Sequence, residues 1–310
     1  MQYEARHFCQ GFFVDNRLNK YKMNTEEPNS KIRVAIQGEE GCYHELAARQ
    51  YFEGKEVEIV PCLTFNSMFE TLAADPQLFG IMAIENTIAG NLLQNHELLR
   101  NSQRAVIGEH RLHISHVLCA LPGQTIDDIT EVNSHPIALM QCKVFLDTLP
   151  DVKIVEVDDT AGAAKAIAAG NLKGHAAICS EFAAKLYGLD VLYRSVETNK
   201  RNFTRFLILQ DKFAELMVNK QKINKASLVF TVSHTHGSLS KVLTIMSFYG
   251  INLTKIQSMP IIGREWEYRF FVDVTFDDYT VYRQALDAVR PFSRDFQVLG
   301  EYVESIDNNE

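Results

Sequence analysis

Short apolar segments alternate with segments of helical spacing between residues 32 and 209. The segment IRVAIQ (32–37) alternates apolar and polar positions, whereas HELAARQYF (44–52) repeats its apolar residues at helical spacing. The same rhythm recurs in GIMAIEN (80–86), KIVEV (152–156), TAGAAKAIAAG (160–170), HAAICS (175–180) and EFAAKLYG (181–188). This alternation predicts an α/β domain with largely parallel strands, in which ligands bind beyond the carboxyl ends of the strands.

The pattern changes after a polar stretch. SLVFTVS (227–233) predicts a strand, and GSLSKVLTIMSFYG (237–250) predicts a helix that ends at a glycine. A helix over 279–290 and three further strands complete the unit, the strands being INLTKIQSMP (251–260), YRFFVDVTF (268–276) and FQVLGEYV (296–303). The order β-α-β-β-α-β predicts a ferredoxin-like domain.

These patterns divide the chain into five parts. We predict a disordered N-terminal extension, an α/β domain, a linker, a ferredoxin-like domain and a tail, at residues 1–30, 31–210, 211–226, 227–305 and 306–310. The first part lacks the apolar core and cleavage site of a signal peptide, which predicts a cytoplasmic protein. Met23 is a second candidate start of translation beside Met1.

Composition narrows the classes of partner. The 310 residues carry a net charge of −8, which argues against nucleic acid and anionic membranes but leaves a small anionic substrate open. No apolar run is long enough to span a bilayer. The six cysteines show no metal-binding spacing, so we expect reduced thiols and no metal.

Polar residues gather where helices are predicted to begin. QGEEGCYHE (37–45), IENT (84–87), SHP (134–136) and DTAGAA (159–164) each follow a strand or open a helix, and capping or a plain turn accounts for each one alone. NFTRFLIL (202–209) adds Thr204 and Arg205 at the head of an apolar run. Together these groups suit a small molecule with two carboxylates, one held by Arg205 and the other by helix N-termini.

Simpler interpretations of these residues stand beside that one. Thr204 also fits as a β-branched strand residue and Arg205 as a surface cation. His44 and His135 are candidate proton carriers, but a histidine at a helix start also serves as a cap.

The motifs resemble those of monofunctional prephenate dehydratases, which have a catalytic domain followed by an ACT regulatory domain. The matching stretches run in order along residues 32 to about 304 and include AIQGEEGCYHELAA, PCLTFNSMFETL, AIENTIAG, SHPIALMQC, DDTAGAA, NFTRFLIL, GSLSKVL and INLTKIQSMP. The resemblance implies a catalytic domain with two lobes, like a type II periplasmic binding protein.

It also implies a reaction in L-phenylalanine biosynthesis that needs no cofactor. Prephenate loses its ring hydroxyl and ring carboxylate to give phenylpyruvate, water and CO2. Thr204 would assist the departing hydroxyl and Arg205 would bind the side-chain carboxylate, as the two catalytic residues. The implied substrate-binding residues are Asn86, Thr87, Ser134, Gln141, Thr160, Asn202 and Phe206.

The ACT resemblance implies feedback inhibition by L-phenylalanine and a homodimer or homotetramer. The implied effector residues are Gly237, Ser238, Leu239, Asn252, Leu253, Gln257 and Ser258. The chain departs from the family at Gln257–Pro260, where Gln-Ser-Met-Pro replaces Glu-Ser-Arg-Pro and removes one charge of each sign. It also has His44 where the family has Ser or Thr.

Two other functions remain open from the sequence. Arogenate dehydratase performs the same chemistry on the amino analogue, and an acidic partner such as Glu85 near the amino group would favour it. A non-catalytic amino-acid-sensing protein is the alternative of another class, although the intact NFTRF run (202–206) argues against it.

Overall fold

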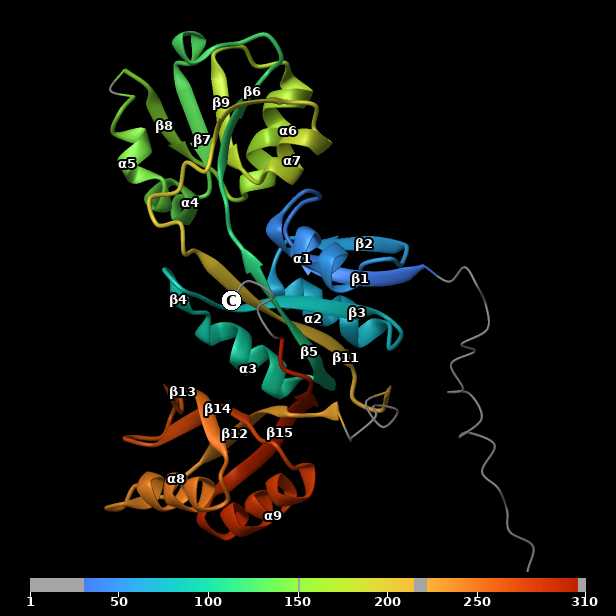
Figure 1. The fold of residues 1–310 in the computed structure, drawn as a ribbon, viewed down its shortest axis with the longest axis vertical. Helices are drawn as coiled ribbons and strands as arrows, with labels where there is room; N and C mark the ends of the chain where they lie inside the picture. The colour runs from blue at the N-terminus through green and yellow to red at the C-terminus, as the bar shows by residue number, and fades with distance from the viewer. Residues whose placement is uncertain (1–30, 150, 215–221, 306–310) are drawn as a thin grey trace, which may run out of the picture. The chain divides into compact units, whose positions relative to one another are not determined.

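The structure, a computed structural model, describes residues 31–149, 151–214 and 222–305 (Figure 1). The predicted N-terminal extension, the tail and residues 215–221 of the predicted linker lie outside the described residues. Within the described residues, no helix combines the length and the apolar character needed to cross a membrane.

The first sheet contains the strands around Thr204. Its strands in this part are β1 (Ile32–Gln37), β2 (Val57–Cys62), β3 (Phe79–Asn86), β4 (Gly90–Asn91), β5 (Arg104–His113) and β11 (Phe203–Asp211), and its helices are α1 (Tyr43–Tyr51), α2 (Phe65–Ala74) and α3 (Leu93–Asn101). β1 pairs in parallel with β2 and β3, whereas β11 lies antiparallel between β3 and β5.

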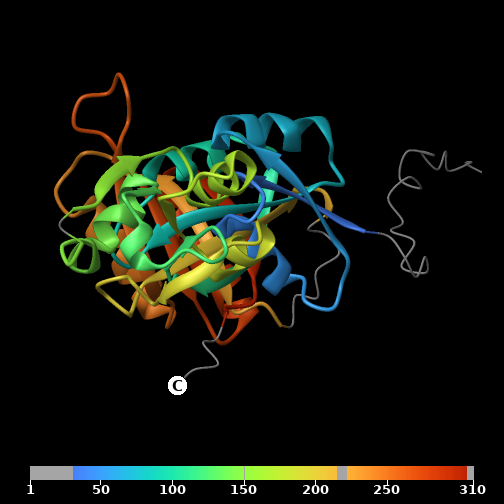
Figure 2. The same ribbon diagram turned by 90° about the horizontal axis from the view of Figure 1, so that it is seen from above.

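The second sheet is inserted between β5 and β11 and has the strand order β10-β6-β9-β7-β8. Its strands are β6 (Val117–Ala120), β7 (Glu131–Ser134), β8 (Lys153–Glu156), β9 (His175–Cys179) and β10 (Asp190–Arg194). Its helices are α4 (Pro136–Gln141), α5 (Lys143–Leu146), α6 (Thr160–Gly170) and α7 (Glu181–Leu186), seen from above in green to yellow in Figure 2.

The prediction of largely parallel strands is wrong, because both sheets are mixed. The chain passes from β5 to β6 and from β10 to β11 without a helix. The chain leaves the first sheet along β5 and returns to it along β11, so these two strands run in opposite directions, as β6 and β10 do in the second sheet. The two-sheet division itself agrees with the two lobes that the resemblance implied.

The C-terminal domain, Lys225–Tyr302, is ferredoxin-like, as predicted. Its elements are β12 (Lys225–Thr231), α8 (Ser238–Phe248), β13 (Asn252–Pro260), β14 (Tyr268–Thr275), α9 (Tyr279–Val289) and β15 (Arg294–Tyr302). The antiparallel order is β13-β14-β12-β15, and α8 and α9 cover one face of these strands (Figure 1). An apolar core that includes Val242, Met246 and Tyr282 lies under the helices.

The C-terminal sheet joins the first sheet edge to edge. β15 pairs in parallel with β5 where Gly300 lies opposite Val106. A Cβ atom on Gly300 would collide with the Val106 carbonyl, so the close approach requires glycine at this position. Strands on both sides of this junction share an apolar core that contains Met82 and Leu207 with Phe271 and Tyr302.

The cysteines agree with the expectation of reduced thiols. The five within the described residues are free and buried, namely Cys42, Cys62, Cys119, Cys142 and Cys179. The sulfur atoms of Cys119 and Cys179 lie 3.4 Å apart on the neighbouring strands β6 and β9.

Candidate functional site

Thr204 lies directly opposite Asn86 in the antiparallel pair of β11 and β3. Asn86 Nδ2 donates to Thr204 Oγ1 at 2.9 Å and to Asn202 Oδ1 at 2.8 Å. Directly opposed residues of a sheet carry their side chains on the same face, so the strand pairing itself brings Asn86 to the threonine.

The hydrogen bonds continue from Asn202 into the second sheet. Asn202 Nδ2 donates to Gln141 Oε1 at 2.9 Å, and His116 Nε2 lies 3.0 Å from the same oxygen. His116 Nδ1 in turn lies 2.8 Å from the Tyr43 hydroxyl. We call these six residues the amide network: Tyr43, Asn86, His116, Gln141, Asn202 and Thr204.

The amide network spans the two segments that connect the sheets. His116 ends the β5–β6 connection and Asn202 ends the β10–β11 connection. The two connections are also tied by backbone hydrogen bonds, from Ile114 N to Asn202 O at 2.7 Å and from Val196 N to His116 O at 3.0 Å. Any change in the angle between the two sheets must therefore bend these two connections, which include His116 and Asn202 of the amide network.

The network is uncharged at neutral pH. Burial lowers the pKa of His116, and burial raises the pKa of Tyr43 well above its usual value. A neutral His116 that faces the Gln141 carbonyl oxygen must carry its proton on Nε2, so its Nδ1 is an acceptor that shares the Tyr43 hydroxyl with Ser115 O, which lies 2.9 Å from that hydroxyl. The network therefore fixes side-chain orientation without placing a charge beside Thr204.

Glu197 supplies a charge behind the network. Its Oε2 accepts from the His116 backbone N–H at 2.8 Å, and its Oε1 accepts from Ser195 Oγ at 2.8 Å. Burial acts to raise the pKa of Glu197, but these hydrogen bonds outweigh it and the pKa is lowered. An ionised Glu197 anchors the connection that leads into β11.

Asn86 forms a turn instead of capping a helix. Its Oδ1 accepts from Ile88 N at 2.9 Å and Ala89 N at 2.8 Å, and the next helix begins only at Leu93. The neighbouring Thr87 hydroxyl donates to Arg201 O at 3.0 Å and accepts from Phe203 N at 2.9 Å. The expectation that a helix begins directly after this strand is wrong. The Asn86 side chain forms an Asx turn, in which it accepts the backbone N–H groups that a helix start would leave free.

The starts of α4 and α6 show the predicted capping. His135 Nδ1 accepts from Ile137 N at 3.2 Å, with Pro136 as the first helical residue. Ser134 is fully buried and donates to Ile178 O at 2.6 Å, so its hydroxyl serves the core of the second sheet. Thr160 is half-buried at the start of α6.

Asp159, the cap of α6, lies beside the glycine loop that precedes α1. Its Oδ1 accepts from Gly162 N at 2.8 Å, and a Cβ on Gly38 would lie 3.2 Å from its Oδ2. Burial raises the pKa of Asp159. The predicted helix starts of the two sheets therefore approach each other at this point.

Arg205 lies on the opposite face of β11 from Thr204, and the prediction that it binds a substrate carboxylate is not supported. Its side chain is 7% exposed; Nη1 lies 2.8 Å from Glu109, Nε lies 2.7 Å from Glu85, and Nη2 contacts Asp273. Burial opposes the charge, but these carboxylates raise the pKa of Arg205. Its guanidinium already contacts three protein carboxylates, although Nε makes no well-aligned hydrogen bond.

The residues around Arg205 form a group that we call the ion cluster, which is buried except for the partly exposed Glu85 and Glu304. Its members are Glu85, Glu109, Arg205, Lys225, Lys255, Asp273 and Glu304. Lys225 bridges Glu109 at 2.8 Å and Glu304 at 3.1 Å, and Lys255 lies 2.9 Å from Glu85. The cluster joins β3, β5 and β11 to the C-terminal domain.

His44 is half-buried and packs against aromatic rings, and its surroundings argue against the expectation that it carries protons. Its Nε2 accepts from Ala83 N at 3.3 Å, and its ring packs edge-on against Phe206 and Phe65. Burial lowers the pKa of His44 to about 4, which leaves it neutral at pH 7. Phe206, predicted to bind substrate, is buried in this aromatic group.

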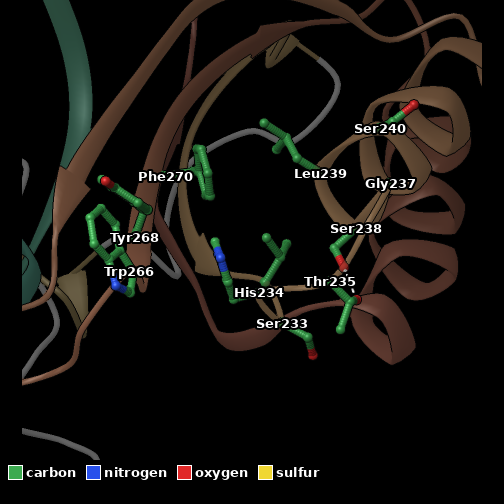
Figure 3. Close-up of a pocket in the computed structure, with 11 residues that line it drawn as sticks. Ser233, His234, Thr235, Gly237, Ser238, Leu239, Ser240, Trp266, Tyr268 and Phe270 are labelled. Carbon is green, nitrogen blue, oxygen red and sulfur yellow. Dashed lines mark hydrogen bonds between the residues drawn. The ribbon is translucent and has the colours of Figure 1, made fainter.

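The predicted effector residues separate into two sets. Gly237, Ser238 and Leu239 line a pocket of about 360 Å³, opposite Trp266 and Tyr268 (Figure 3). Asn252, Leu253, Gln257 and Ser258 lie on β13 and do not belong to this lining. Gln257 Oε1 instead accepts from Asn91 Nδ2 of β4 at 2.8 Å.

Tyr43 and His116 are the site residues that the sequence did not single out. Tyr43 stands within the glycine-containing stretch 37–45 but had no apparent partner there, and His116 had no motif around it. Their roles follow from contacts across the two sheets, which local spacing does not encode. Among the described residues, no group of His, Cys, Asp and Glu side chains is arranged to hold a metal ion.

Comparison with known proteins places the whole amide network inside a matched region. The family described as prephenate dehydratase matches residues 34–214. Arogenate dehydratase/prephenate dehydratase 2, chloroplastic, of Arabidopsis thaliana is 36% identical over 284 residues, which cover 88% of this chain and 73% of that protein. The bifunctional chorismate mutase/prephenate dehydratase of Enterobacter agglomerans is 32% identical over 283 residues, covering 90% of this chain and 73% of that one.

Two solved structures extend the likeness to the fold. The prephenate dehydratase of Arthrobacter aurescens in complex with L-Phe has a TM-score of 0.78 at 26% identity, over 88% of this chain and 90% of that one. GqqA, described as a novel type of quorum-quenching acylase, has a TM-score of 0.79 at 32% identity, over 88% of this chain and 98% of that one. The chain belongs to the prephenate dehydratase family, whose members are lyases of phenylalanine biosynthesis.

Proposed function

We propose that the protein converts prephenate to phenylpyruvate, water and CO2, with Thr204 as the catalytic residue. The observation that carries the proposal is the hydrogen bond from Asn86 to Thr204 Oγ1, held within the amide network of a dehydratase-family chain. Since Oγ1 accepts from Asn86, the threonine's own hydrogen is free to be directed at a ligand.

The reaction needs a group that helps hydroxide leave. The C–C bond to the ring carboxylate breaks, its electrons complete the aromatic ring, and the C–O bond to the ring hydroxyl breaks as CO2 departs. A hydrogen bond from Thr204 to the departing oxygen stabilises the developing negative charge, and the hydroxide takes up a proton from the solvent to become water. Threonine is a weak acid, so this contribution depends on placement, which the amide network supplies.

The two carboxylates of prephenate require donors other than Arg205. α1 begins without a side-chain cap, since Cys42 makes no capping hydrogen bond. Its first-turn N–H groups are the donors that we assign to the dianion, since those of α6 are already held by the Asp159 side chain. Closure of one sheet against the other through the connections at His116 and Asn202 would complete the site and exclude water.

Prephenate is favoured over arogenate by the placement of Glu85. Arogenate carries an ammonium group that would need a carboxylate partner, and Glu85 was the candidate. Glu85 instead lies on the Arg205 face of the sheet, paired with Arg205 and Lys255. The Arabidopsis and Petunia relatives include proteins named as arogenate dehydratases, so both substrates belong in the assay.

We propose L-phenylalanine as the effector of the C-terminal domain, which we identify as an ACT domain. The pocket lined by Gly237–Ser240 combines Leu239 and Phe270 with the first turn of α8, whose N–H groups suit a carboxylate (Figure 3). The similar Arthrobacter aurescens structure contains L-Phe. A homodimer or homotetramer and a cytoplasmic location remain predictions from the sequence.

The likeness to GqqA raises acylase activity as a second candidate function. A hydrolase of that kind needs a nucleophile beside a proton acceptor. Thr204 receives its hydrogen bond from the Asn86 amide nitrogen, which cannot take a proton, and His116 faces Gln141. The geometry therefore favours the lyase reaction over acyl transfer.

The test is a turnover assay on the purified protein. Prephenate, L-arogenate and an acylated amine are offered in parallel, each with and without L-phenylalanine, and Thr204→Ala serves as the control. We expect phenylpyruvate from prephenate, suppressed by L-phenylalanine and formed at least about a hundredfold more slowly with Thr204→Ala. Product from arogenate alone would move the assignment to that substrate, and ligand binding without product would favour the sensor.

A further inference from the structure

Two charged residues of the C-terminal domain reach the strands that carry the catalytic threonine. Asp273 of β14 contacts Arg205, the residue after Thr204 on β11. Lys255 of β13 lies 2.9 Å from Glu85, the residue before Asn86 on β3. The C-terminal domain therefore contacts both strands, β3 and β11, one residue away from the Asn86–Thr204 hydrogen bond.

The strand register places these contacts directly beside the Thr204–Asn86 pair. Thr204 pairs with Asn86, and Arg205 pairs with Glu85, as successive cross-strand pairs. The first pair belongs to the amide network and the second to the ion cluster on the opposite face. Movement of Arg205 or Glu85 must move the backbone of its catalytic neighbour.

The backbone pairing of the sheet alone holds the Thr204 end of β11 weakly. The register shifts between Arg205 and Phe206, because Arg205 pairs with Glu85 while Phe206 pairs with Ala83. A shift of this kind interrupts the regular ladder and leaves one residue unpaired. The two pairs at the end of β11 and β3 thus need side-chain anchors to keep a fixed position.

The anchors are shielded from solvent. The side chains of Arg205, Asp273 and Lys255 are 7%, 8% and 9% exposed. Asp273 is fixed in turn by Ser227, whose hydroxyl donates to its Oδ1 at 2.6 Å. Removing one member of such a buried set leaves an uncompensated charge, so the surroundings must rearrange.

We propose that Asp273 and Lys255 are positioning residues for the dehydratase reaction. They hold Arg205 and Glu85 and thereby fix Thr204 and Asn86 on the other face of the sheet. The proposal rests on the function proposed above and adds to it a direct part for the C-terminal domain in the geometry of the catalytic threonine.

The alternative is that these contacts only dock the C-terminal domain. A matched control exists, because Arg269 of β14 lies 2.7 Å from Glu97 of α3. This ion pair also joins the C-terminal domain to the first sheet's elements, but neither residue neighbours Thr204 or Asn86 in the chain. Arg269→Gln therefore reports the effect of weaker docking alone.

The test compares the steady-state kinetics of Asp273→Asn, Lys255→Gln and Arg269→Gln on prephenate. We expect Asp273→Asn to lower kcat by about tenfold to a hundredfold, as a small misplacement does, with KM changed less than about threefold. Lys255→Gln should lower kcat less, and Asp273→Glu should recover part of the loss. Equal kcat values for Asp273→Asn and Arg269→Gln, or a loss confined to KM, would overturn the proposal.

A second readout does not depend on the reaction. Amide hydrogen exchange across Phe203–Leu209 should be faster in Asp273→Asn than in Arg269→Gln, and equal exchange would contradict the positioning role. If the wild-type protein makes no phenylpyruvate, the proposed function fails while the exchange result still decides the anchoring. Should Asp273→Asn not fold, Lys255→Gln decides both readouts against the same control.

Discussion

Thr204 and Arg205 follow one another in the chain but belong to two chemically different regions. Thr204 joins a network of neutral amides, a neutral histidine and a tyrosine that connects the two sheets. Arg205 joins a buried cluster of charges that connects the first sheet to the C-terminal domain. The comparison shows that one strand separates a neutral hydrogen-bond network on one face from a cluster of ion pairs on the other.

The difference also explains why each region has its character. A side chain that must assist a leaving hydroxide needs a fixed position and no competing charge, which amides provide. A side chain that must hold two domains in register gains from strong, directional ion pairs, which a guanidinium provides. The following predictions set these two regions against each other.

The largest effect is expected at Thr204. Thr204→Ala should lower kcat by about a hundredfold to ten-thousandfold with little change in KM, because it removes the group that assists the leaving oxygen. Steady-state kinetics with prephenate measure it. Thr204→Ser keeps the hydroxyl and should retain much of the activity; equal losses in both variants would mean that the methyl group and packing matter instead.

Arg205→Gln should act on stability more than on substrate binding. It leaves Glu85, Glu109 and Asp273 without their shared cation, and breaking a buried pair costs about 3 to 5 kcal/mol. Urea unfolding measures this loss of unfolding free energy. Arg201→Gln is the control, because Arg201 is exposed. Unchanged stability with a large rise in KM would restore the substrate-binding role first expected for Arg205.

Acid should destabilise the protein through its buried histidines. Burial lowers the folded-state pKa of His44 to about 4 from 6.5, so the unfolded chain binds the proton more readily. The stabilising contribution of the neutral His44 side chain is complete above pH 6.5 and is lost as the pH falls toward 4. His44→Gln should reduce the loss between pH 6.5 and 5 by roughly 2 kcal/mol, measured by urea unfolding at each pH.

His96 provides the same test in the other region. Its pKa is also lowered to about 4, by burial and then by Lys255, and its ring packs against Phe271 of the C-terminal domain. His96→Gln should flatten the acid loss by a similar amount. If neither substitution changes the pH dependence, the two histidines are not buried in the neutral form.

Gly300→Ala should have the smallest effect of the set. The added Cβ meets the Val106 backbone, so β15 must move away from β5 at a cost of about 1 to 3 kcal/mol. Thermal unfolding measures it, and Gly162→Ala is the control, because an added Cβ there makes only ordinary contacts, the nearest at 3.4 Å. No loss at Gly300 would mean that the edge-to-edge junction is not required.

Much of the fold follows from local pattern. The ferredoxin-like order, the caps at His135 and Asp159, and most strand positions were predictable from residue spacing. The mixed pairing was not, because strands that pass between sheets look like any other apolar segment. The direction of β11 depends on where its partners lie.

The site was predictable in part. Asn86, Gln141, Asn202 and Thr204 were expected to lie together, and they do. The period of a strand already places residues 204 and 205 on opposite faces, so a shared substrate role conflicted with the pattern from the start. What the sequence does not contain is the C-terminal domain's contact with Arg205, since Asp273 lies 68 residues away.

The most direct test is a crystal structure of Thr204→Ala with prephenate bound. The account predicts that the ring hydroxyl lies beside residue 204 and the Asn86 amide, while Arg205 remains paired with Glu85, Glu109 and Asp273. A structure in which Arg205 has left Asp273 and binds a substrate carboxylate would contradict it.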